Sequence, residues 1–348
     1  MNELRRDPIS GRWSIIIHDE LQTDKLLVNV RKRRTSGKQH EPTCPFCKGN
    51  EHLTPEPIHV EQANGNPVDW QVRVIPDKYP VLRVEGDLNN RGHGMYDLLN
   101  GIGAHEIIIE TPQHGTHPAD FSDDHLARVF AVYQNRIRDL KADLRFRYVM
   151  VYKNYGEATG PAVGHSYSYV IATPVTPPRV KQELINAAEH YRLKERCLFC
   201  DILHQELSEQ TRVVSESEHF LAYLPFASRS PLETWIMPKQ HETFFERSDK
   251  IPELASLFKR TVRGIQKILR DPNYVMVIHS GPNTSFGHRR GYWKTLEQDY
   301  HWHIEIIPQL RGFTSFELVS GIRANFLPPE KGAALLREQI ASTSETES

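Results

Sequence analysis

The two halves of this chain carry the same landmarks in the same order, and this internal repeat restricts the fold more than any other feature. A C-x-x-C pair opens each set, at Cys44 and Cys47 and again at Cys197 and Cys200. Each pair is followed by an extended segment, a segment that ends in Pro and His, an amphipathic helix and a buried strand. Repeats of this length indicate two copies of one α+β domain and not a solenoid.

Two strand segments give the most direct matches between the halves. Tyr148–Val151 reads YVMV and is answered by Tyr274–Val277, which also reads YVMV. His165–Tyr169 (HSYSY) is answered by His301–Glu305 (HWHIE). Between these strands and the earlier Pro-His segment of the first half lies a helix that Ser122 can cap. Several landmarks matched in one order make a chance resemblance between the halves improbable.

The repeat therefore predicts an α+β protein of two tandem domains, each an antiparallel sheet with a packed helix. We place the domains at residues 1–180 and 181–340 and expect the tail, residues 341–348, to be disordered. The segment Gly86–Gly103 is rich in Asn and Gly, and we expect it to be a loop.

Composition excludes several classes of protein. Hydrophobic residues make up 39% of the chain and charged residues 25%, which is typical of a globular protein. The net charge of -1 argues against a large nucleic-acid surface, so no nucleic-acid partner is expected. No apolar run is long enough to span a membrane, and the N-terminal segment lacks the apolar core of a signal peptide. We therefore expect a cytoplasmic protein without a membrane partner.

The cysteines point to metal. All four lie in C-x-x-C pairs, and the chain has 18 histidines, so metal binding is favoured over a redox pair or simple buried thiols. His114 is preferred to its neighbours His105 and His117 because it matches His241 in the repeat. Two thiolates and two imidazoles suit tetrahedral Zn²⁺, and a site with four protein ligands has no open position for water, which indicates a structural role. We predict one Zn²⁺ per domain, two in total, held by Cys44, Cys47, His114 and His165, and by Cys197, Cys200, His241 and His301.

The stretch from Tyr148 to Tyr169 carries the other candidate chemistry. A buried strand leads into a Gly-rich turn and then into a second strand with polar residues at alternate positions. Because side chains alternate along a strand, His165, Tyr167 and Tyr169 share one face. Such a face next to a Gly-rich loop is suited to a phosphate or a metal, although a half-buried strand with aromatic cross-strand pairs explains it equally well.

The combined motifs resemble the galactose-1-phosphate uridylyltransferase family, a two-domain branch of the histidine triad superfamily. The resemblance runs from RRDPISGRW near the N-terminus to about residue 325. The motifs that carry it are CPFC, IPDKYP, HEIIIETPQH, VYKNYG, GHSYSYV, CLFC, MPKQH and YHWHIEIIP.

The resemblance implies two histidine-triad-like domains, usually in a homodimer. It also implies transfer of a nucleoside monophosphate between a nucleotide sugar and a hexose-1-phosphate through a nucleotidyl-histidine intermediate. The family's metal ligands match the first predicted set. The second set resembles that of a subgroup that acts on nucleotide sugars or related substrates.

The resemblance also assigns substrate contacts. Arg31 and Arg34 match in part a basic stretch that contacts phosphate, and guanidinium groups suit phosphate oxygens. Asp77 lies where the family has a residue near the nucleoside. Asn154 and Gly156 match an Asn-x-Gly turn that would hold the phosphate through a side-chain amide and close backbone approach.

One departure concerns the catalytic motif, which in the family is His-x-His-x-Gln. Here Tyr167 occupies the position of the nucleophilic His, and Tyr169 that of the Gln. A phenol has a reference pKa near 10, so it is almost wholly protonated at neutral pH unless a base or cations lower that pKa.

Three hypotheses follow from this departure. The protein is a nucleotidyltransferase with an altered mechanism, using direct transfer or Tyr167 as the nucleophile. Alternatively, it is a catalytically impaired homologue that binds nucleotide sugars in a regulatory or structural role. In the third, the chemistry has moved to the second domain, where His303 and Glu305 match Tyr167 and Tyr169.

Overall fold

The computed structural model describes residues 1–21, 23, 39–62, 69–156, 164–285 and 293–347. Within them, ten strands form one antiparallel sheet in the order β10-β11-β12-β14-β13-β8-β9-β7-β4-β3. The first half of the chain supplies β3 (His59–Gln62), β4 (Trp70–Pro76), β7 (Ala104–His114), β8 (Tyr148–Tyr155) and β9 (His165–Thr173). The second half supplies β10 (Val213–Glu216), β11 (Phe220–Tyr223), β12 (Thr234–Pro238), β13 (Tyr274–His279) and β14 (His303–Pro308).

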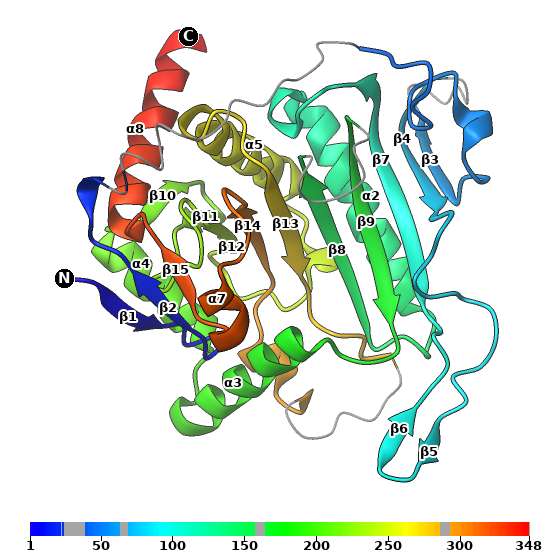
Figure 1. Ribbon diagram of the computed structural model, residues 1–348, viewed down its shortest axis with the longest axis horizontal. Coiled ribbons are helices and arrows are strands. Elements are labelled where there is room, and N and C mark those ends of the chain that lie inside the picture. The colour runs from blue at the N-terminus through cyan, green and yellow to red at the C-terminus, as the bar shows by residue number, and fades with distance from the viewer. Residues whose placement is uncertain (22, 24–38, 63–68, 157–163, 286–292, 348) are drawn as a thin grey trace.

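The two halves of this sheet meet at β8 and β13. These strands pair antiparallel from Tyr155 opposite Tyr274 to Val151 opposite Ile278. Each half repeats the same strand order outward from this seam, and Figure 1 shows the halves as one continuous sheet. The α+β class predicted from the repeat is confirmed. The predicted domain boundary at residue 180 stays a prediction, since the sheet passes through both halves without a break.

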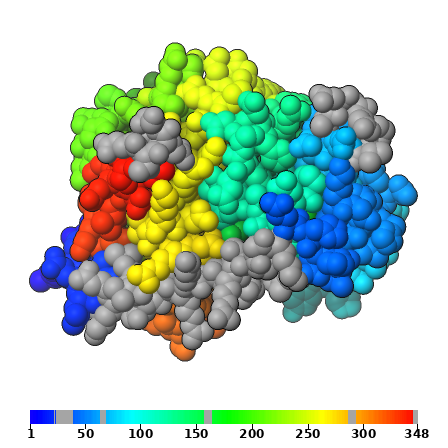
Figure 2. Space-filling view, turned by 90° about the horizontal axis from the view of Figure 1, so that it is seen from above, coloured from blue at the N-terminus to red at the C-terminus, as the bar shows by residue number. Residues whose placement is uncertain are grey.

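Helices cover the sheet on both faces. We call the face under α2 (Asp123–Lys141) and α5 (Ile251–Ile268) the inner face. The two helices lie side by side in Figure 2, where α2 is teal and α5 is yellow, and Lys259 binds Asp123 at 2.8 Å. The Ser122 side chain accepts a hydrogen bond from the His125 amide and so caps α2, as the sequence predicts.

The opposite, outer face is covered by α3 (Pro178–Lys194) and α4 (Leu198–Glu209) only in the second half. In the first half the outer face meets the C-x-x-C segment, which packs Cys44, Phe46 and Cys47 against Tyr167. The inner-face core is larger and joins apolar residues of both halves into one cluster. Among the described residues, no α-helix contributes to the outer-face core of the first half, which carries the candidate site.

Smaller elements complete the fold. β1 (Glu3–Arg6) and β2 (Trp13–Ile16) form a hairpin, and β2 pairs in parallel with β15 (Arg323–Asn325). The remaining short elements are β5 (Arg91–His93), β6 (Tyr96–Leu98), α6 (Leu296–Asp299), α7 (Ser315–Ser320) and the single turns η1 (Glu51–Leu53), η2 (Pro118–Asp120) and η4 (Phe245–Arg247). None of the helices among the described residues is long and apolar enough to cross a membrane.

The structure differs from two local predictions. The segment predicted to be a loop, Gly86–Gly103, contains the β5–β6 hairpin, whose turn holds Gly94 at a φ of 61°. The tail predicted to be disordered continues α8 (Pro329–Glu347) to residue 347. Thr343 in this helix accepts a hydrogen bond from Lys267 at 2.9 Å, so contact with α5 explains why a polar segment is helical.

The YVMV match is shifted by one residue in the structure. Tyr148 packs in the outer-face core, whereas Tyr274 packs in the inner-face core. Because side chains alternate between faces, the two tyrosines cannot occupy equivalent positions. When Tyr167 is matched to His303, Ala172 is the counterpart of Pro308. The strand partner of Ala172 is Val149 and that of Pro308 is Tyr274, so Val149 is the equivalent of Tyr274.

Candidate functional site

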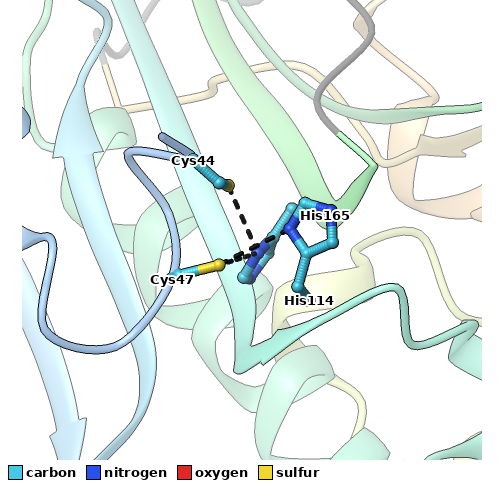
Figure 3. A group of neighbouring side chains, drawn as sticks. All are labelled: Cys44, Cys47, His114 and His165. Carbon is cyan, nitrogen blue, oxygen red and sulfur yellow. Dashed lines mark hydrogen bonds between the residues drawn. The ribbon is translucent and has the colours of Figure 1, made fainter. Parts of the chain in front are cut away.

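The first Cys–His cluster forms as the sequence predicts, where the C-x-x-C segment meets the ends of β7 and β9 (Figure 3). Cys47 Sγ lies 3.5 Å from His114 Nδ1 and 3.7 Å from His165 Nδ1, and Cys44 Sγ lies 3.7 Å from His165 Nδ1. A tetrahedral metal with Zn–S near 2.3 Å and Zn–N near 2.0 Å needs sulfur and nitrogen separated by about 3.5 Å. The donor set and spacing therefore fit a metal ion.

The orientation of the His165 ring supports the same interpretation. Its Nδ1 faces the sulfurs, so Nε2 carries the hydrogen and donates it to the Thr111 carbonyl at 2.7 Å. A metal-bound histidine ordinarily fixes its tautomer by such a bond from the other nitrogen. Burial lowers the pKa of His165 to about 4, which keeps the imidazole neutral as a ligand.

The second predicted cluster is also assembled. Cys200 Sγ lies 3.4 Å from His241 Nδ1 and 3.7 Å from His301 Nδ1, and Cys197 completes the group. His241 Nε2 faces the Glu297 carbonyl at 3.1 Å, so here the ligand that meets a carbonyl is the counterpart of His114, whereas in the first cluster it is His165. Both clusters can thus hold a metal.

Beside the first cluster, aromatic rings cover the outer face of the sheet. Tyr169 stacks on Tyr152 at 5.1 Å and on His105 at 5.3 Å between ring centroids. His105 Nδ1 lies 3.3 Å from a carboxylate oxygen of Asp77, the residue predicted near the nucleoside. Tyr167 contacts Tyr169 edge-on at 5.4 Å. The structure therefore brings Asp77, Tyr167 and Tyr169 together through one set of ring contacts.

The surroundings of Tyr167 keep its phenol protonated. Only 5% of the residue is exposed, and burial raises the pKa of the phenol well above its usual value. A hydrogen bond with Tyr169 and the proximity of Tyr152 and Asp77 raise the pKa further. Tyr152 itself has a pKa raised to about 12, mainly by burial. The largest influences on the pKa of the Tyr167 phenol, burial first, all oppose its ionisation.

The remaining predicted substrate contacts are placed in part. Asn154 lies on β8 two positions after Tyr152, so the two residues are on the same outer face. Gly156 follows β8 with a φ of 104°, and a Cβ there would lie 1.8 Å from Asn273 Oδ1. The positive φ and the close approach of Asn273, which precedes β13, together favour glycine at this position. Arg31 and Arg34 lie outside the described residues.

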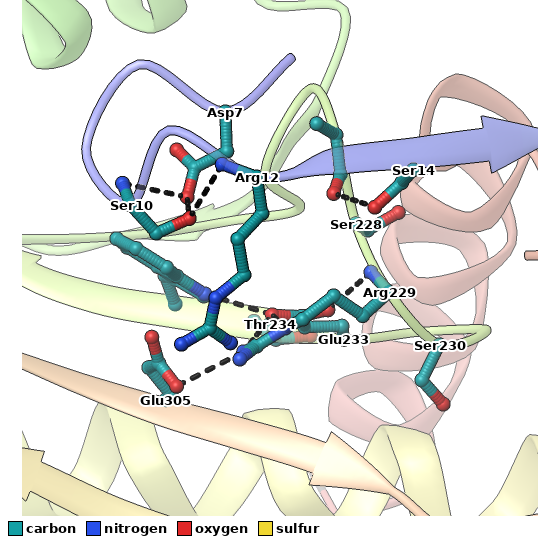
Figure 4. Close-up of polar contacts among 12 residues, drawn as sticks. Asp7, Ser10, Arg12, Ser14, Ser228, Arg229, Ser230, Glu233, Thr234 and Glu305 are labelled. Atoms are coloured by element: carbon teal, nitrogen blue, oxygen red, sulfur yellow. Dashed lines mark hydrogen bonds and ion pairs between the residues drawn. The ribbon is translucent and has the colours of Figure 1, made fainter. Parts of the chain in front are cut away.

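The equivalent face of the second half is closed. His303 is fully buried between Trp235 and His279, with ring centroids 4.7 and 4.5 Å away and ring planes tilted by 9° and 15°. Burial lowers the pKa of His303 to about 4. Glu305 is also fully buried. Its carboxylate accepts hydrogen bonds from Arg229 at 2.9 Å (Figure 4) and from Arg179. His303 is therefore less accessible than Tyr167, so the structure does not favour chemistry in this half, and that hypothesis stays untested.

Ring packing confirms that Tyr167 and His303 are equivalent positions. Phe46 of the first C-x-x-C segment contacts Tyr167 at 5.3 Å between ring centroids. Phe199 of the second segment contacts His303 at 5.5 Å. The two halves therefore place a C-x-x-C phenylalanine against the same strand position.

Sequence reasoning missed two buried polar groups. Lys153 and Glu110 form an ion pair at 2.6 Å behind β9, with both side chains 2% exposed. Glu183 and His279 form a second pair at 3.0 Å and, with His303 and Glu305, make a further group of possible ligands. The only available signal for Lys153 was a charged residue at an inward position of a strand that is otherwise apolar.

Comparisons with known proteins place this architecture in a family. The chain is 31% identical to ADP-glucose phosphorylase of Arabidopsis thaliana over 342 residues, which cover 97% of this chain and 92% of the relative. The chain belongs to the galactose-1-phosphate uridylyltransferase-like family. It is also 25% identical to galactose-1-phosphate uridylyltransferase of Thermotoga maritima, with 97% and 98% coverage. A model described as the N-terminal domain of a domain of unknown function, DUF4931, matches residues 92–174.

Solved structures agree with this assignment. The crystal structure of an ADP-glucose phosphorylase from Arabidopsis thaliana with bound ADP-glucose has a TM-score of 0.79 and 28% identity, covering 97% of this chain and 99% of that one. A uridylyltransferase structure has a TM-score of 0.73 at 24% identity and shares the fold, covering 99% of each chain. Because the relatives are enzymes of this family, the chain is a nucleotidyltransferase-like enzyme.

Proposed function

We propose that the protein moves a nucleoside monophosphate between a nucleotide sugar and a hexose-1-phosphate by direct transfer, without a covalent intermediate on the chain. The observation that carries this proposal is the state of Tyr167. It occupies the position of the family's nucleophile, yet the residue is 5% exposed and its ring packs against Phe46 and Tyr169, and a phenol is protonated at neutral pH unless a base or a cation lowers its pKa. A phenol that stays protonated is a poor nucleophile and a good hydrogen-bond donor.

In this mechanism an oxygen of the acceptor phosphate attacks the α-phosphorus of the nucleotide sugar. The bond from that phosphorus to the oxygen of the sugar phosphate breaks, and hexose-1-phosphate leaves with the bonding electrons. The Tyr167 hydroxyl donates a hydrogen bond to a non-bridging oxygen, where negative charge increases in the transition state. Attack and departure occur at phosphate oxygens that are already ionised, so the step requires no proton transfer to the protein.

The substrate contacts of the proposal lie on the outer face and in the preceding basic segment. Tyr169 and the rings stacked on it provide an apolar surface next to the Tyr167 hydroxyl. The relative named ADP-glucose phosphorylase makes ADP-glucose the first donor to test, with UDP-glucose and UDP-galactose beside it. The residues proposed to contact substrate are Arg31, Arg34, Asp77, Asn154, Gly156 and Tyr169.

We also propose that each Cys–His cluster holds one Zn²⁺, two per chain. Four protein ligands close the coordination sphere, so the ion would supply rigidity and no bound water. In the first cluster, His165 sits two residues before Tyr167, and Cys44 and Cys47 flank Phe46, which packs on Tyr167. The residues of the cluster therefore orient the strand that carries the phenol.

A second candidate is a homologue that binds nucleotide sugars without turnover. The same protonated phenol favours it, and so does the ring of Tyr169 in place of a Gln that would bind phosphoryl oxygens. Tight binding of ADP-glucose or UDP-glucose with no product formation after addition of hexose-1-phosphate would support this candidate over direct transfer.

Initial-rate kinetics test the proposed mechanism. Direct transfer gives intersecting double-reciprocal lines and inversion at a chiral phosphorus, whereas a covalent intermediate gives parallel lines and retention. Tyr167→Phe removes the hydrogen-bond donor, and we expect kcat to fall about 10²-fold with little change in substrate affinity. A nucleotide adduct on Tyr167, seen in the mass of the intact protein and absent from Tyr167→Phe, would overturn direct transfer.

Three features of assembly and location stay predictions. The homodimer rests on the resemblance to the family, and the cytoplasmic location and the lack of a nucleic-acid partner rest on composition. Sedimentation of the full chain would test the first of these.

A further inference from the structure

Lys153 lies on the inner face of the sheet, directly behind the strand that carries Tyr167. Its ammonium donates to Glu110 Oε2 at 2.6 Å, to Ser166 Oγ at 3.0 Å and to the Tyr167 carbonyl at 2.9 Å. An ammonium has three donors, so these contacts satisfy all of them. The side chain is 2% exposed, which makes this a fully engaged buried charge.

Lys153 joins β8 to β9 where their ladder has ended. The last paired residues are Tyr152 and Tyr169, although β8 continues to Tyr155 alongside β13. Beyond that pair, the ammonium of Lys153 reaches from β8 to the carbonyl of Tyr167 on β9. The end of β9 nearest the candidate site is thus held by a side chain.

Glu110 fixes the same part of β9 from the neighbouring strand β7. Its carboxylate accepts hydrogen bonds from Ser166 at 2.6 Å, from Ser168, and from Tyr133 of α2 at 2.5 Å. Ser166 and Ser168 are the two residues that flank Tyr167, and both point to the inner face. The residue at the centre of the candidate site is therefore anchored on both sides.

The second half of the molecule shows that the fold does not need this charge. When Tyr167 is matched to His303, the strand pairing matches Lys153 to Ile278, and Ser166 and Ser168 to Trp302 and Ile304. These three equivalents belong to the apolar inner-face core. A buried ion pair is seldom more stabilising than apolar residues of similar volume. The polar group is thus specific to the half with the open outer face.

We propose that Lys153, held by Glu110, is a positioning residue that sets the backbone of residues 166–168 and so aims Tyr167 at the substrate. The inference rests on the proposed function of the outer face and adds to it a support from the opposite face. Lys153 acts through the Tyr167 carbonyl and the Ser166 hydroxyl and does not touch substrate.

The test replaces the ion pair by neutral residues of similar size, Lys153→Met with Glu110→Gln, in the full-length chain. Ile278→Met at the equivalent position of the other half is the matched control. Well below the melting temperature, we expect the double variant to lose about 10²-fold in kcat for transfer from ADP-glucose, with KM within about threefold of the original. The control variant should keep both constants. Unchanged kcat in a folded double variant would overturn the proposal.

A second readout does not depend on turnover. Co²⁺ in place of the native metal reports ligand geometry through its visible absorption, and His165 lies next to Ser166. We expect the double variant to alter the bands of one cobalt equivalent, whereas Ile278→Met alters none. If the unaltered chain neither binds nor transfers a nucleotide, the proposed function fails. The cobalt spectra then still decide whether Lys153 positions β9, and unchanged bands would overturn that.

Ser166→Ala covers the case in which the double variant does not fold. It removes one hydrogen bond from the ammonium and leaves the ion pair in place. A loss of kcat in the same direction, about tenfold, is expected, and rates equal to those of the unaltered chain would overturn the proposal.

Discussion

The two halves of the molecule share one framework but differ in how their outer faces are packed. In the first half, Tyr167 and Tyr169 lie in an outer-face cluster to which no α-helix among the described residues contributes, and the polar group of Lys153 lies behind them. In the second half, His303 is enclosed by rings, and the carboxylate of Glu305 is held by arginines. The comparison teaches that the Cys–His clusters are common to both halves, whereas the strand that follows each cluster differs in how far its outer face is enclosed.

We expect the largest effect from variants that remove a ligand from one of the Cys–His clusters. Cys44→Ser and Cys197→Ser should each lose one metal equivalent per chain and more than about 4 kcal/mol of unfolding free energy, because a structural metal site contributes directly to folding. Elemental analysis and denaturant unfolding measure both quantities. Full metal content in either variant would mean that its cluster is not a metal site.

The next effect sharpens the contrast between Glu305 and Tyr169. Glu305→Gln removes the buried charge that Arg229 and Arg179 share and leaves them Glu233 and Glu183 as charged partners. We expect a loss of about 3 kcal/mol of unfolding free energy. Tyr169→Gln places the same residue at the equivalent, half-buried position and should cost at most about 1 kcal/mol. Equal losses in chemical denaturation would show that the two faces are not differently enclosed.

Tyr167→His tests whether the open half lacks only its nucleophile. A neutral imidazole can attack phosphorus, so we expect a nucleotidyl adduct with ADP-glucose or UDP-glucose and transfer faster by about 10²-fold. Mass spectrometry of the intact protein detects the adduct, and Tyr167→Phe is the control without it. If no adduct forms, more than the nucleophile separates this site from that of its relatives.

The last prediction is that kcat of the unaltered protein does not depend on the ionisation of Tyr167. Because burial raises the pKa of Tyr167, its phenol stays protonated between about pH 6 and about pH 9, and kcat should not rise through that range. Tyr167→His should introduce a rise as the imidazole loses its proton, at a pH below its ordinary pKa of about 6.5, because burial lowers the pKa of His303 at the equivalent position. A rise in the unaltered protein that Tyr167→Phe abolishes would reveal a phenolate and contradict direct transfer.

Much of the framework could be predicted from the sequence. C-x-x-C pairs and repeated histidines identified both clusters because ligand type and spacing are local signals, and the position of His114 followed from its match to His241. The same reasoning misplaced YVMV by one residue. An identity of four letters does not reveal which face a strand turns to the core, and the pairing puts Tyr148 and Tyr274 on opposite faces.

The polar support of the site could not be predicted in this way. Lys153, Glu110 and Tyr133 come from β8, β7 and α2, and nothing in their spacing indicates that they meet. The pKa of Tyr167 depends in the same way on burial, on Tyr152 of β8 and on Asp77, which follows β4. Such effects arise from tertiary packing. A sequence pattern can therefore identify a candidate site residue but cannot predict its ionisation state.

The seam between β8 and β13 has a consequence for how the chain matures. A first half that has just been synthesised presents the buried, β-rich edge of β8 before β13 exists to cover it. Exposed edges of this kind recruit other strands, including those of a second nascent chain. Gly156, whose missing Cβ admits Asn273, allows the two halves to close over that edge. The halves are therefore poor candidates for separate expression, and a truncated product would be directed toward aggregation.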